Sequence, residues 1–338
     1  MSSQSQELSP LLFFDTINAY QRTEALKAAI ELQLFTAIAE GNRTAKEVAA
    51  RCGASERGVR ILSDYLVATG FLTKEANSYA LTPDTAMFLD ARSPAYVGGA
   101  VEFLLSPTLR EAFDDVAAAV RKGGTALSEA GSVAPEHPMW VRFARGMAPL
   151  MMLPAQMMTQ LVEIAPERKL RVLDVAAGHG MFGIAFAQRF PNAEIVALDW
   201  PNVLEVAREN AARAGVGERH TLLPGSAFDV DYGDGYDLVL LTNFLHHFDT
   251  PTCETLLRKV HAALRDDGRT MTLEFVPDEN RVTPPHAAMF SLVMLASTPG
   301  GDAYTFSELE RMFQNAGFSR SELHPLPPSP NQVVISHK

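Results

Sequence analysis

Two sets of residues in this 338-residue sequence have side-chain types and spacings that suit ligand binding or catalysis. The first is the stretch DVAAGHGMFG, in which Gly178, Gly180 and Gly183 form a G-x-G-x-x-G pattern. Glycines at this spacing let backbone N–H groups approach a bound nucleotide at the start of a helix. The pattern fits the phosphate turn of a dinucleotide site, and it also fits the loop of a methyl-donor site.

Two carboxylates lie near the glycines, and one of them favours the methyl donor. Asp174 precedes the first glycine, where an anion disfavours pyrophosphate but suits the ammonium and sulfonium charges of S-adenosylmethionine, directly or through water. Asp199 ends the next apolar run, where it can accept hydrogen bonds from ribose hydroxyls. Asp199 does not separate the two interpretations, because both nucleotides contain a ribose. We interpret Gly183 as a glycine that packs the helix against the strand.

The second set is a histidine and a glutamate. YDLVLLTN leads into FLHHFD, which places His246 after a predicted strand, and RTMTLEFV carries Glu274 in an apolar run. A neutral imidazole is a suitable general base for a hydroxyl, because its unperturbed pKa of about 6.5 is close to neutral pH. A buried Glu274 needs a partner, and the other ring nitrogen of His246 is available. On the residues alone, an ordinary loop histidine and a solvent-facing carboxylate remain open.

No metal site is expected. His246, His247 and Asp249 lack a typical ligand spacing. Cys52 and Cys253 belong to no C-x-x-C pair, so both are expected to be reduced thiols.

The spacing of apolar residues along the chain predicts the helices and strands that position these side chains. From about Leu170, short apolar runs alternate with amphipathic segments such as PNVLEVARENAARAG. This alternation predicts a doubly wound, mostly parallel α/β sheet, whose carboxyl edge binds ligands. The segment QVVISHK is predicted as an edge strand.

The first half of the chain reads as helices and includes a segment that resembles a winged helix. We predict a helix from about Ala45, a turn at 52–54, a second helix capped by Ser55, and two short strands. A DNA-reading module remains open, although the second helix carries little basic charge beyond Arg57 and Arg60. A scaffold for dimerisation is favoured by the acidic balance of the chain.

Composition excludes several classes of protein. Hydrophobic residues make up 47% of the chain, mean hydropathy is -0.01, and no apolar run approaches the roughly 20 residues that span a membrane. The start MSSQSQELSP lacks the pattern of a secretory signal, so we expect a cytoplasmic protein. A net charge of -11 disfavours nucleic acid, so we expect neither a nucleic-acid nor a membrane partner.

Four segments in order resemble the motifs of one family. They are LDVAAGHG, ALDWPNVLEVA, GSAFDVDYGDGYDLVLLTNFLHHF and GGDAYTFSELERMFQNAGF. They look like those of class I S-adenosylmethionine-dependent O-methyltransferases of the plant-type and bacterial natural-product group. The resemblance covers nearly the whole chain, because that family begins with a winged-helix dimerisation domain. It implies a homodimer and a Rossmann-like domain with a seven-stranded sheet.

The resemblance also implies which residues hold the cofactor. Asp174, Gly178 and Gly180 would form the loop at its methionine end, and Asp199 with Trp200 would hold the ribose and flank the adenine. Three further residues fall where the family contacts adenine, although the family's aspartate is replaced by serine at the first of them. These are Ser226, Ala227 and Phe228.

His246 corresponds to the family's catalytic histidine, His247 to its replaceable neighbour, and Glu274 to the first of two glutamates that flank the histidine. Where the family commonly reads G-G-x-E-R-T, this chain reads GGDAYT. Ala303 therefore occupies the place of the second glutamate, and Asp302 can compensate only from the neighbouring position. This departure leaves room for a carbon or nitrogen nucleophile, or for an acceptor acidic enough to need little help.

Two apolar stretches are expected near the acceptor. Six of the 13 methionines lie between Met139 and Met158, either as an adaptable substrate wall or as ordinary helix core or subunit interface. PPHAAMFSLVMLASTPGGDAY is expected to form a helix over the cleft. Mostly apolar walls predict an uncharged, aromatic or polyketide-like acceptor.

These observations predict a methyltransferase that uses S-adenosylmethionine and releases S-adenosylhomocysteine. Residues 1–100 are predicted as a winged-helix-like dimerisation domain, 101–165 as a helical linker and substrate-wall segment, and 166–338 as the cofactor-binding domain. Three alternatives remain: a nicotinamide-dependent oxidoreductase, a ligand-sensing DNA-binding regulator, and an enzyme that binds S-adenosylmethionine for a non-methylating reaction.

Overall fold

The computed structural model describes residues 8–127, 131–133, 136–165 and 167–338, and the chain divides into two compact units, Met1–Val101 and Glu102–Lys338. Most of the N-terminal stretch that we inspected for a secretory signal therefore lies outside the described residues. Within the described ranges, no helix is both long and apolar enough to cross a membrane.

The first unit contains the predicted winged helix. Thr44 begins one helix with a reciprocal capping box to Glu47, Gly53 ends it in the left-handed conformation, and Ser55 caps the next through the N–H of Gly58. The elements of this unit are α1 (Leu11–Ile17), α2 (Ala19–Glu31), α3 (Leu34–Ala39), α4 (Ala45–Cys52), α5 (Glu56–Ala68), β1 (Leu72–Glu75), β2 (Ser78–Leu81) and α6 (Pro83–Phe88).

The second helix of this motif carries two arginines, of which Arg57 is exposed and Arg60 is already ion-paired. Arg60 of α5 forms an ion pair with Asp64 at 3.2 Å, and Asp64 also binds Lys74 of the wing. A DNA-reading helix needs cations that are free to neutralise phosphates. The geometry therefore favours the scaffold interpretation.

The second unit holds a seven-stranded sheet in the order β5-β4-β3-β6-β7-β9-β8. Strands β3 to β7 run parallel, and β9 is antiparallel to both of its neighbours. The predicted fold class is confirmed. The strands are β3 (Leu170–Val175), β4 (Ala193–Asp199), β5 (His220–Pro224), β6 (Tyr236–Thr242), β7 (Leu264–Glu274), β8 (Arg320–Pro325) and β9 (Gln332–His337).

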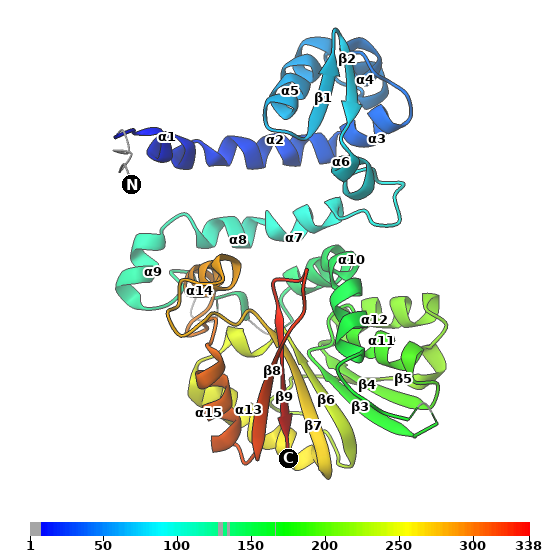
Figure 1. Cartoon of the computed structure of the whole chain (residues 1–338), viewed down its shortest axis with the longest axis vertical. Helices are drawn as coiled ribbons and strands as arrows, with labels where there is room; N and C mark the ends of the chain where they lie inside the picture. Colours follow the sequence, from blue (N-terminus) through cyan, green and yellow to red (C-terminus); the bar gives the residue numbers. More distant parts are fainter. Residues whose placement is uncertain (1–7, 128–130, 134–135, 166) are drawn as a thin grey trace, which may run out of the picture. The chain divides into compact units, whose positions relative to one another are not determined.

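Helices cover both faces of this sheet, as Figure 1 shows for α11 and α12 against α13 and α15. The apolar side chains of each strand alternate between the two resulting cores, which explains why β6 is buried along its whole length. The helices of this unit are α7 (Val101–Leu104), α8 (Pro107–Ala112), α9 (Val116–Lys122), α10 (Met139–Thr159), α11 (Met181–Arg189), α12 (Pro201–Arg213), η4 (Leu245–His247), α13 (Thr250–Ala263), α14 (Pro285–Ser297) and α15 (Phe306–Asn315).

The prediction that QVVISHK forms an edge strand is wrong. This segment is β9, which lies between β7 and β8, and β8 forms the edge. Its run of buried residues, Val333 to Ile335, is the signature of an interior strand, whereas β8 alternates exposed and half-buried positions. The sequence reading missed β8 because its residues are mostly polar.

Gly183 packs α11 closely against the sheet. A Cβ at this position would lie 2.7 Å from Cγ2 of Ile195 and 3.1 Å from Oδ2 of Asp174. We expect Gly183→Ala to lower the free energy of unfolding of the second unit by about 1–3 kcal/mol through overpacking. Urea unfolding followed by tryptophan fluorescence measures this unit alone, because both tryptophans, Trp140 and Trp200, lie in it.

The matched control is Gly217→Ala, whose new Cβ would lie 3.6 Å from the nearest atom. It should leave the unfolding midpoint within experimental error. Equal midpoints for wild type and Gly183→Ala would show that the contact with β4 relaxes without cost.

Candidate active site

The side chains predicted to do chemistry lie at the carboxyl ends of adjacent strands. Asp174 is the next-to-last residue of β3, Asp199 is the last of β4 and Glu274 is the last of β7. Residues 226–228 follow β5, and His246 lies in η4 after β6. Because these strands are parallel, their carboxyl ends meet at the sheet edge where open α/β sheets bind ligands.

The loop after β3 has a left-handed backbone at three positions. Ala176, Gly178 and Gly180 have φ angles of 55°, 57° and 73°, which glycine adopts freely and alanine only with strain. A Cβ on Gly180 would also lie 3.0 Å from the Cβ of Ala207 on α12. The N–H of Gly178 donates to Oδ2 of Asp199 over 2.8 Å, which ties this loop to the end of β4.

Asp174 is fully buried. Its Oδ2 accepts a hydrogen bond from the N–H of Gly183 at 3.0 Å, while its Oδ1 has no partner among the described residues. Burial raises the pKa of Asp174 to about 7; the bond from Gly183 opposes this shift and the Asp199 carboxylate adds to it. The chain thus holds an acceptor oxygen that a positively charged or hydrogen-bonding group can satisfy.

Asp199 is half-buried, and each of its carboxylate oxygens receives one backbone hydrogen bond. Oδ1 accepts from the N–H of Trp200 at 2.7 Å, and Oδ2 accepts from that of Gly178. Burial raises the pKa of Asp199 to about 6 against these two bonds. A carboxylate oxygen accepts more than one hydrogen bond, so both oxygens keep capacity for the hydroxyls of a ribose.

The next two predicted contacts are placed by α12 and α13. Trp200, which precedes α12, packs against a cluster formed by residues of α10 and α12. The carbonyls of Ala227 and Phe228 both accept from Nζ of Lys259, at 3.2 and 3.0 Å, while Ser226 Oγ accepts from the N–H of Phe228 at 3.2 Å. Ser226 therefore closes its own turn.

His246 and Glu274 form a buried pair. Nδ1 of His246 lies 2.5 Å from Oε2 of Glu274, and both side chains are about 95% buried. The other oxygen, Oε1, accepts from the backbone N–H groups of Phe244 and Leu245 at 3.0 and 2.8 Å. One carboxylate therefore positions both the imidazole and the backbone that carries it.

Further contacts hold this loop, and the sequence did not reveal them. Sγ of Cys253 donates to the carbonyl of Leu245 at 3.2 Å, and Oη of Tyr304 donates to that of Phe248 at 2.5 Å. Gly301 packs so closely that a Cβ there would lie 2.2 Å from the carbonyl oxygen of His246. These residues are 8 to 56 positions from their partners, so no local pattern marks them.

Ala303, at the place of the family's second glutamate, is fully buried, and among the described residues Glu274 is the one acid in contact with His246. Asp302 is ion-paired with Arg281 at 3.2 Å, so it does not compensate. Phe290 of α14 instead meets His246 edge-on, with ring centroids 4.9 Å apart. Its ring stacks at 4.1 Å on Phe275, the residue directly after Glu274.

Aromatic residues of α10 contact both the glycine loop and η4. Phe143 stacks on His179 with ring centroids 6.0 Å apart, and Trp140 meets His247 edge-on at 5.3 Å. Burial lowers the pKa of His179 to about 4. Two side chains one helical turn apart thus connect the glycine loop with the histidine pair.

The methionines of α10 differ in burial. Met158 is buried in the core of the sheet, and Met151 accepts a weak hydrogen bond from Nδ2 of Asn243 at 3.8 Å. Met152 is 40% exposed.

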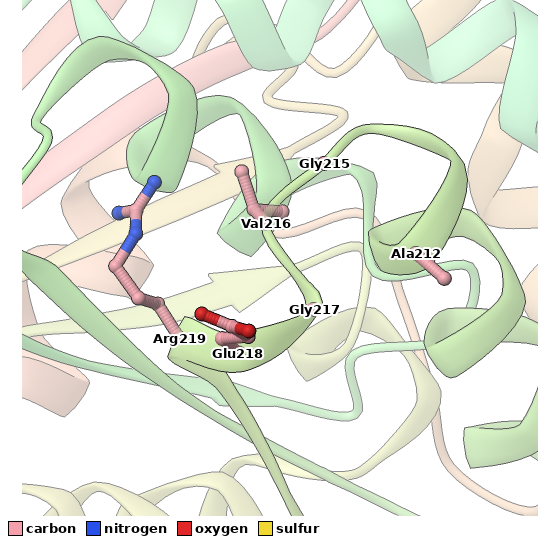
Figure 2. A pocket seen from close by; sticks show the side chains of 6 residues that line it. All are labelled: Ala212, Gly215, Val216, Gly217, Glu218 and Arg219. Carbon is pink, nitrogen blue, oxygen red and sulfur yellow. The ribbon is translucent and has the colours of Figure 1, made fainter.

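A surface depression lies away from this site, at the start of β5 (Figure 2). Its position at the amino end of a strand places it at the opposite edge of the sheet. The guanidinium of Arg219 donates to the carbonyls of Ala187, Phe190 and Ala193, so its donors serve the end of α11. The residues that line the depression are Ala212, Gly215, Val216, Gly217, Glu218 and Arg219.

The described residues include no group of three or more His, Cys, Asp or Glu side chains arranged to hold a metal ion.

The fold and these side chains define a class of protein. A glycine turn follows β3, a carboxylate ends β4, and a histidine–glutamate pair joins the ends of β6 and β7. This arrangement is that of an S-adenosylmethionine-dependent methyltransferase with a Rossmann-like sheet.

Comparisons with known proteins specify the family. The model of the O-methyltransferase domain matches residues 114–319, and that of the O-methyltransferase dimerisation domain matches residues 14–91. The chain belongs to this O-methyltransferase family, so the resemblance found in its motifs is confirmed.

Three similar proteins represent this family. A crystal structure from Nostoc punctiforme, named as a candidate O-methyltransferase, is 57% identical, covers 98% of this chain and 100% of its own, and has a TM-score of 0.94. The 3-hydroxy-5-methyl-1-naphthoate 3-O-methyltransferase of Streptomyces sahachiroi is 29% identical over 92% of this chain and 90% of its own. Human N-acetylserotonin methyltransferase, solved with S-adenosylmethionine, shares the fold at 21% identity, with coverages of 100% and 99% and a TM-score of 0.86.

The buried carboxyl of Asp174 makes stability depend on pH in the ligand-free protein. Its protonated form contributes stability that is fully present below the unfolded pKa of about 3.9 and is lost as pH rises through about 7. At pH 8, the free energy of unfolding of Asp174→Asn should therefore exceed that of wild type by about 1–3 kcal/mol. The difference should be smaller at pH 5.

Tryptophan fluorescence again supplies the measurement, and the exposed Asp234 supplies the control. Asp234→Asn, at an exposed residue, should unfold at the wild-type urea concentration. A gap for Asp174→Asn that stays constant between pH 5 and 8 would contradict the raised pKa.

Proposed function

We propose that this chain transfers a methyl group from S-adenosylmethionine to a hydroxyl of a small, apolar, aromatic or polyketide-like acceptor, with His246 as the general base. The hydrogen bond between Nδ1 of His246 and Oε2 of Glu274 is the observation that carries this proposal. The naphthoate substrate of the Streptomyces sahachiroi relative supports an aromatic hydroxyl as the acceptor group.

The residues at the carboxyl edge of the sheet fit the proposed cofactor. The left-handed turns at Gly178 and Gly180, the unpartnered Oδ1 of Asp174 and the spare acceptor capacity of Asp199 match an adenosine that carries a cationic methionine end. Trp200 and the segment 226–228 would flank its adenine. When bound, S-adenosylmethionine supplies an electrophilic methyl group, and the protein must supply alignment and deprotonation.

Glu274 determines how His246 works. By accepting a hydrogen from Nδ1, the carboxylate selects the imidazole tautomer in which Nε2 has a free lone pair. That nitrogen takes the proton from the acceptor hydroxyl, and the negative charge of Glu274 stabilises the imidazolium that forms. The backbone bonds from Phe244 and Leu245 stabilise the carboxylate in its turn.

Three segments of the chain have separate roles in this proposal. Residues 1–100 form the dimerisation domain, 101–165 a helical segment with a substrate wall, and 166–338 the cofactor-binding domain. The match to the dimerisation-domain model supports a homodimer. Helix α1 supports it further, because it buries no residue and exposes a row of large apolar side chains: Leu11, Leu12, Phe13, Phe14 and Ile17. A cytoplasmic location completes the proposal.

The first experiment titrates the purified protein with S-adenosylhomocysteine and, separately, with NADH in a calorimeter. Micromolar binding of S-adenosylhomocysteine alone is the expected result, because Asp174 disfavours pyrophosphate. Turnover of a phenolic acceptor by His246→Ala should then fall about 10²–10⁴-fold between pH 6 and 9, while S-adenosylhomocysteine binds as in wild type.

His261, in the last turn of α13, provides the control, since His261→Ala should keep wild-type turnover. Binding of NADH alone would overturn the methyltransferase. Near-normal turnover by His246→Ala would overturn only the assignment of the base, and binding of neither nucleotide would favour a non-catalytic regulator.

The dimer is tested by placing a charge on α1. Leu12 and Phe13 are 79% and 62% exposed, so the double variant Leu12→Asp, Phe13→Asp leaves the core of the first unit intact. Light scattering after gel filtration should give twice 36.8 kDa for wild type and 36.8 kDa for the double variant. Val282→Asp, at an exposed apolar residue of the second unit, should keep the wild-type mass. A double variant that remains dimeric would place the interface elsewhere.

A further inference from the structure

The stretch of residues 298–301, which follows α14, lies between the loop that carries His246 and the end of α9. Helices α9 and α14 pack against each other in the second unit (Figure 1). A Cβ on Gly301 would lie 2.2 Å from the carbonyl oxygen of His246, and one on Gly300 would lie 3.2 Å from the Cβ of Asp249. One side of the stretch therefore touches the backbone of the proposed base.

The other side of the stretch meets the segment after α9 just as closely. The N–H of Thr125 donates to the carbonyl of Thr298 at 2.8 Å. A Cβ on Gly124, which is buried, would lie 2.3 Å from the carbonyl oxygen of Pro299. No side chain fits into such a gap, so the two backbones touch only because residue 124 is a glycine.

A short and rigid turn joins these two contacts. The φ angle of Pro299 is fixed by its ring. Oγ1 of Thr298, which is fully buried, donates to the carbonyl of Met294 and accepts from the N–H of Gly301, each at 2.8 Å. Because closely packed interiors transmit displacements, a shift of the carbonyl of Pro299 is passed on to Gly301.

The backbone of His246 cannot yield to such a shift without loss. On its far side, Glu274 accepts hydrogen bonds from Nδ1 of His246 and from the N–H groups of Phe244 and Leu245. Pressure on the carbonyl of His246 lengthens or bends these bonds, and hydrogen bonds weaken steeply when they are bent. A catalytic group that is misplaced by about 1 Å lowers a rate by about 100-fold.

We propose that Gly124 is a positioning residue for His246 and that it acts through residues 298–301. The segment after α9, which belongs to the proposed substrate wall, thereby sets the position of the proposed base. Wall and base move as one body, so an acceptor that displaces the wall also misplaces the base. This inference rests on the proposed function, and it makes the fit of the acceptor against the wall a determinant of kcat.

The test replaces Gly124 by alanine and follows the hydrogen bond between His246 and Glu274 by proton NMR. A hydrogen held between Nδ1 and a carboxylate gives a far-downfield signal, which His246→Ala identifies by its loss. Gly124→Ala should shift or remove this signal and lower kcat with 2-naphthol by about 10- to 100-fold. The affinity for S-adenosylhomocysteine should not change, because its proposed site lies at the ends of β3, β4 and β5.

A second variant presses on the same stretch from a neighbouring point. A Cβ on Gly131 would lie 2.6 Å from the carbonyl oxygen of Ser297, directly before Thr298. Gly131→Ala should therefore change the signal and kcat in the same direction as Gly124→Ala.

The matched control is Gly268→Ala, whose Cβ would lie 2.9 Å from the carbonyl oxygens of Arg265 and Tyr236. It also presses a side chain against backbone in the second unit, but at the amino ends of β6 and β7. It should lower the urea midpoint through overpacking, yet keep the wild-type signal and kcat.

A wild-type signal in both Gly124→Ala and Gly131→Ala overturns the proposal. So does an equal change in Gly268→Ala, because overpacking anywhere in the unit would then suffice, and so does a wild type without the signal, because Glu274 would then not hold the base. The signal requires neither cofactor nor acceptor. A wild type that binds no S-adenosylhomocysteine would refute the proposed function, and the NMR comparison would still decide this inference.

Discussion

The buried carboxylate of Glu274 is the group on which the conformation of the loop that carries His246 depends. It ends β7, yet all three of its hydrogen bonds go to the loop after β6. A buried carboxylate is tolerated only where its charge is well partnered, so the loop must adopt the one conformation that directs two N–H groups and an imidazole at it. The position of His246 is thus a consequence of satisfying this charge. Cys253, Tyr304 and Gly301 then hold the outer side of the same loop.

The carboxylates of the proposed cofactor site differ from Glu274, because their hydrogen bonding is incomplete. Asp174 is buried and Asp199 is half-buried. Burial raises the pKa of each carboxyl, and among the described residues only backbone N–H groups donate hydrogen bonds to them. A cationic ligand with ribose hydroxyls relieves both carboxyls, whereas a diphosphate adds charge of the same sign. The cost of burying these carboxyls in the ligand-free protein is therefore recovered as binding free energy when such a ligand binds.

The sequence predicted the positions of these side chains correctly where position follows from local order along the chain. The glycine turn, the carboxylate after the next strand and the histidine after the fourth each follow a recognisable apolar run, and parallel topology brings their positions together. It failed where placement depends on distant partners. Nothing in the polar segment of β8 marks a strand, and β9 was assigned to the edge because its place between β7 and β8 is decided by tertiary pairing. The sequence also could not predict that Phe290 contacts His246 edge-on, or that Asp302 forms an ion pair with Arg281.

The interior position of β9 has a consequence for how the protein is made. Glu274 pairs in register with Gln332, the first residue of β9, and β9 enters the sheet from the C-terminal end of the described chain. During synthesis, the strand that carries Glu274 therefore has an open edge until residues 332–337 leave the ribosome. The glycine turn and its two carboxylates, in contrast, are complete once β6 has formed beside β3. The nascent chain can therefore form the glycine turn well before the pair of His246 and Glu274 is complete, so the two halves of the candidate site form at different times during synthesis.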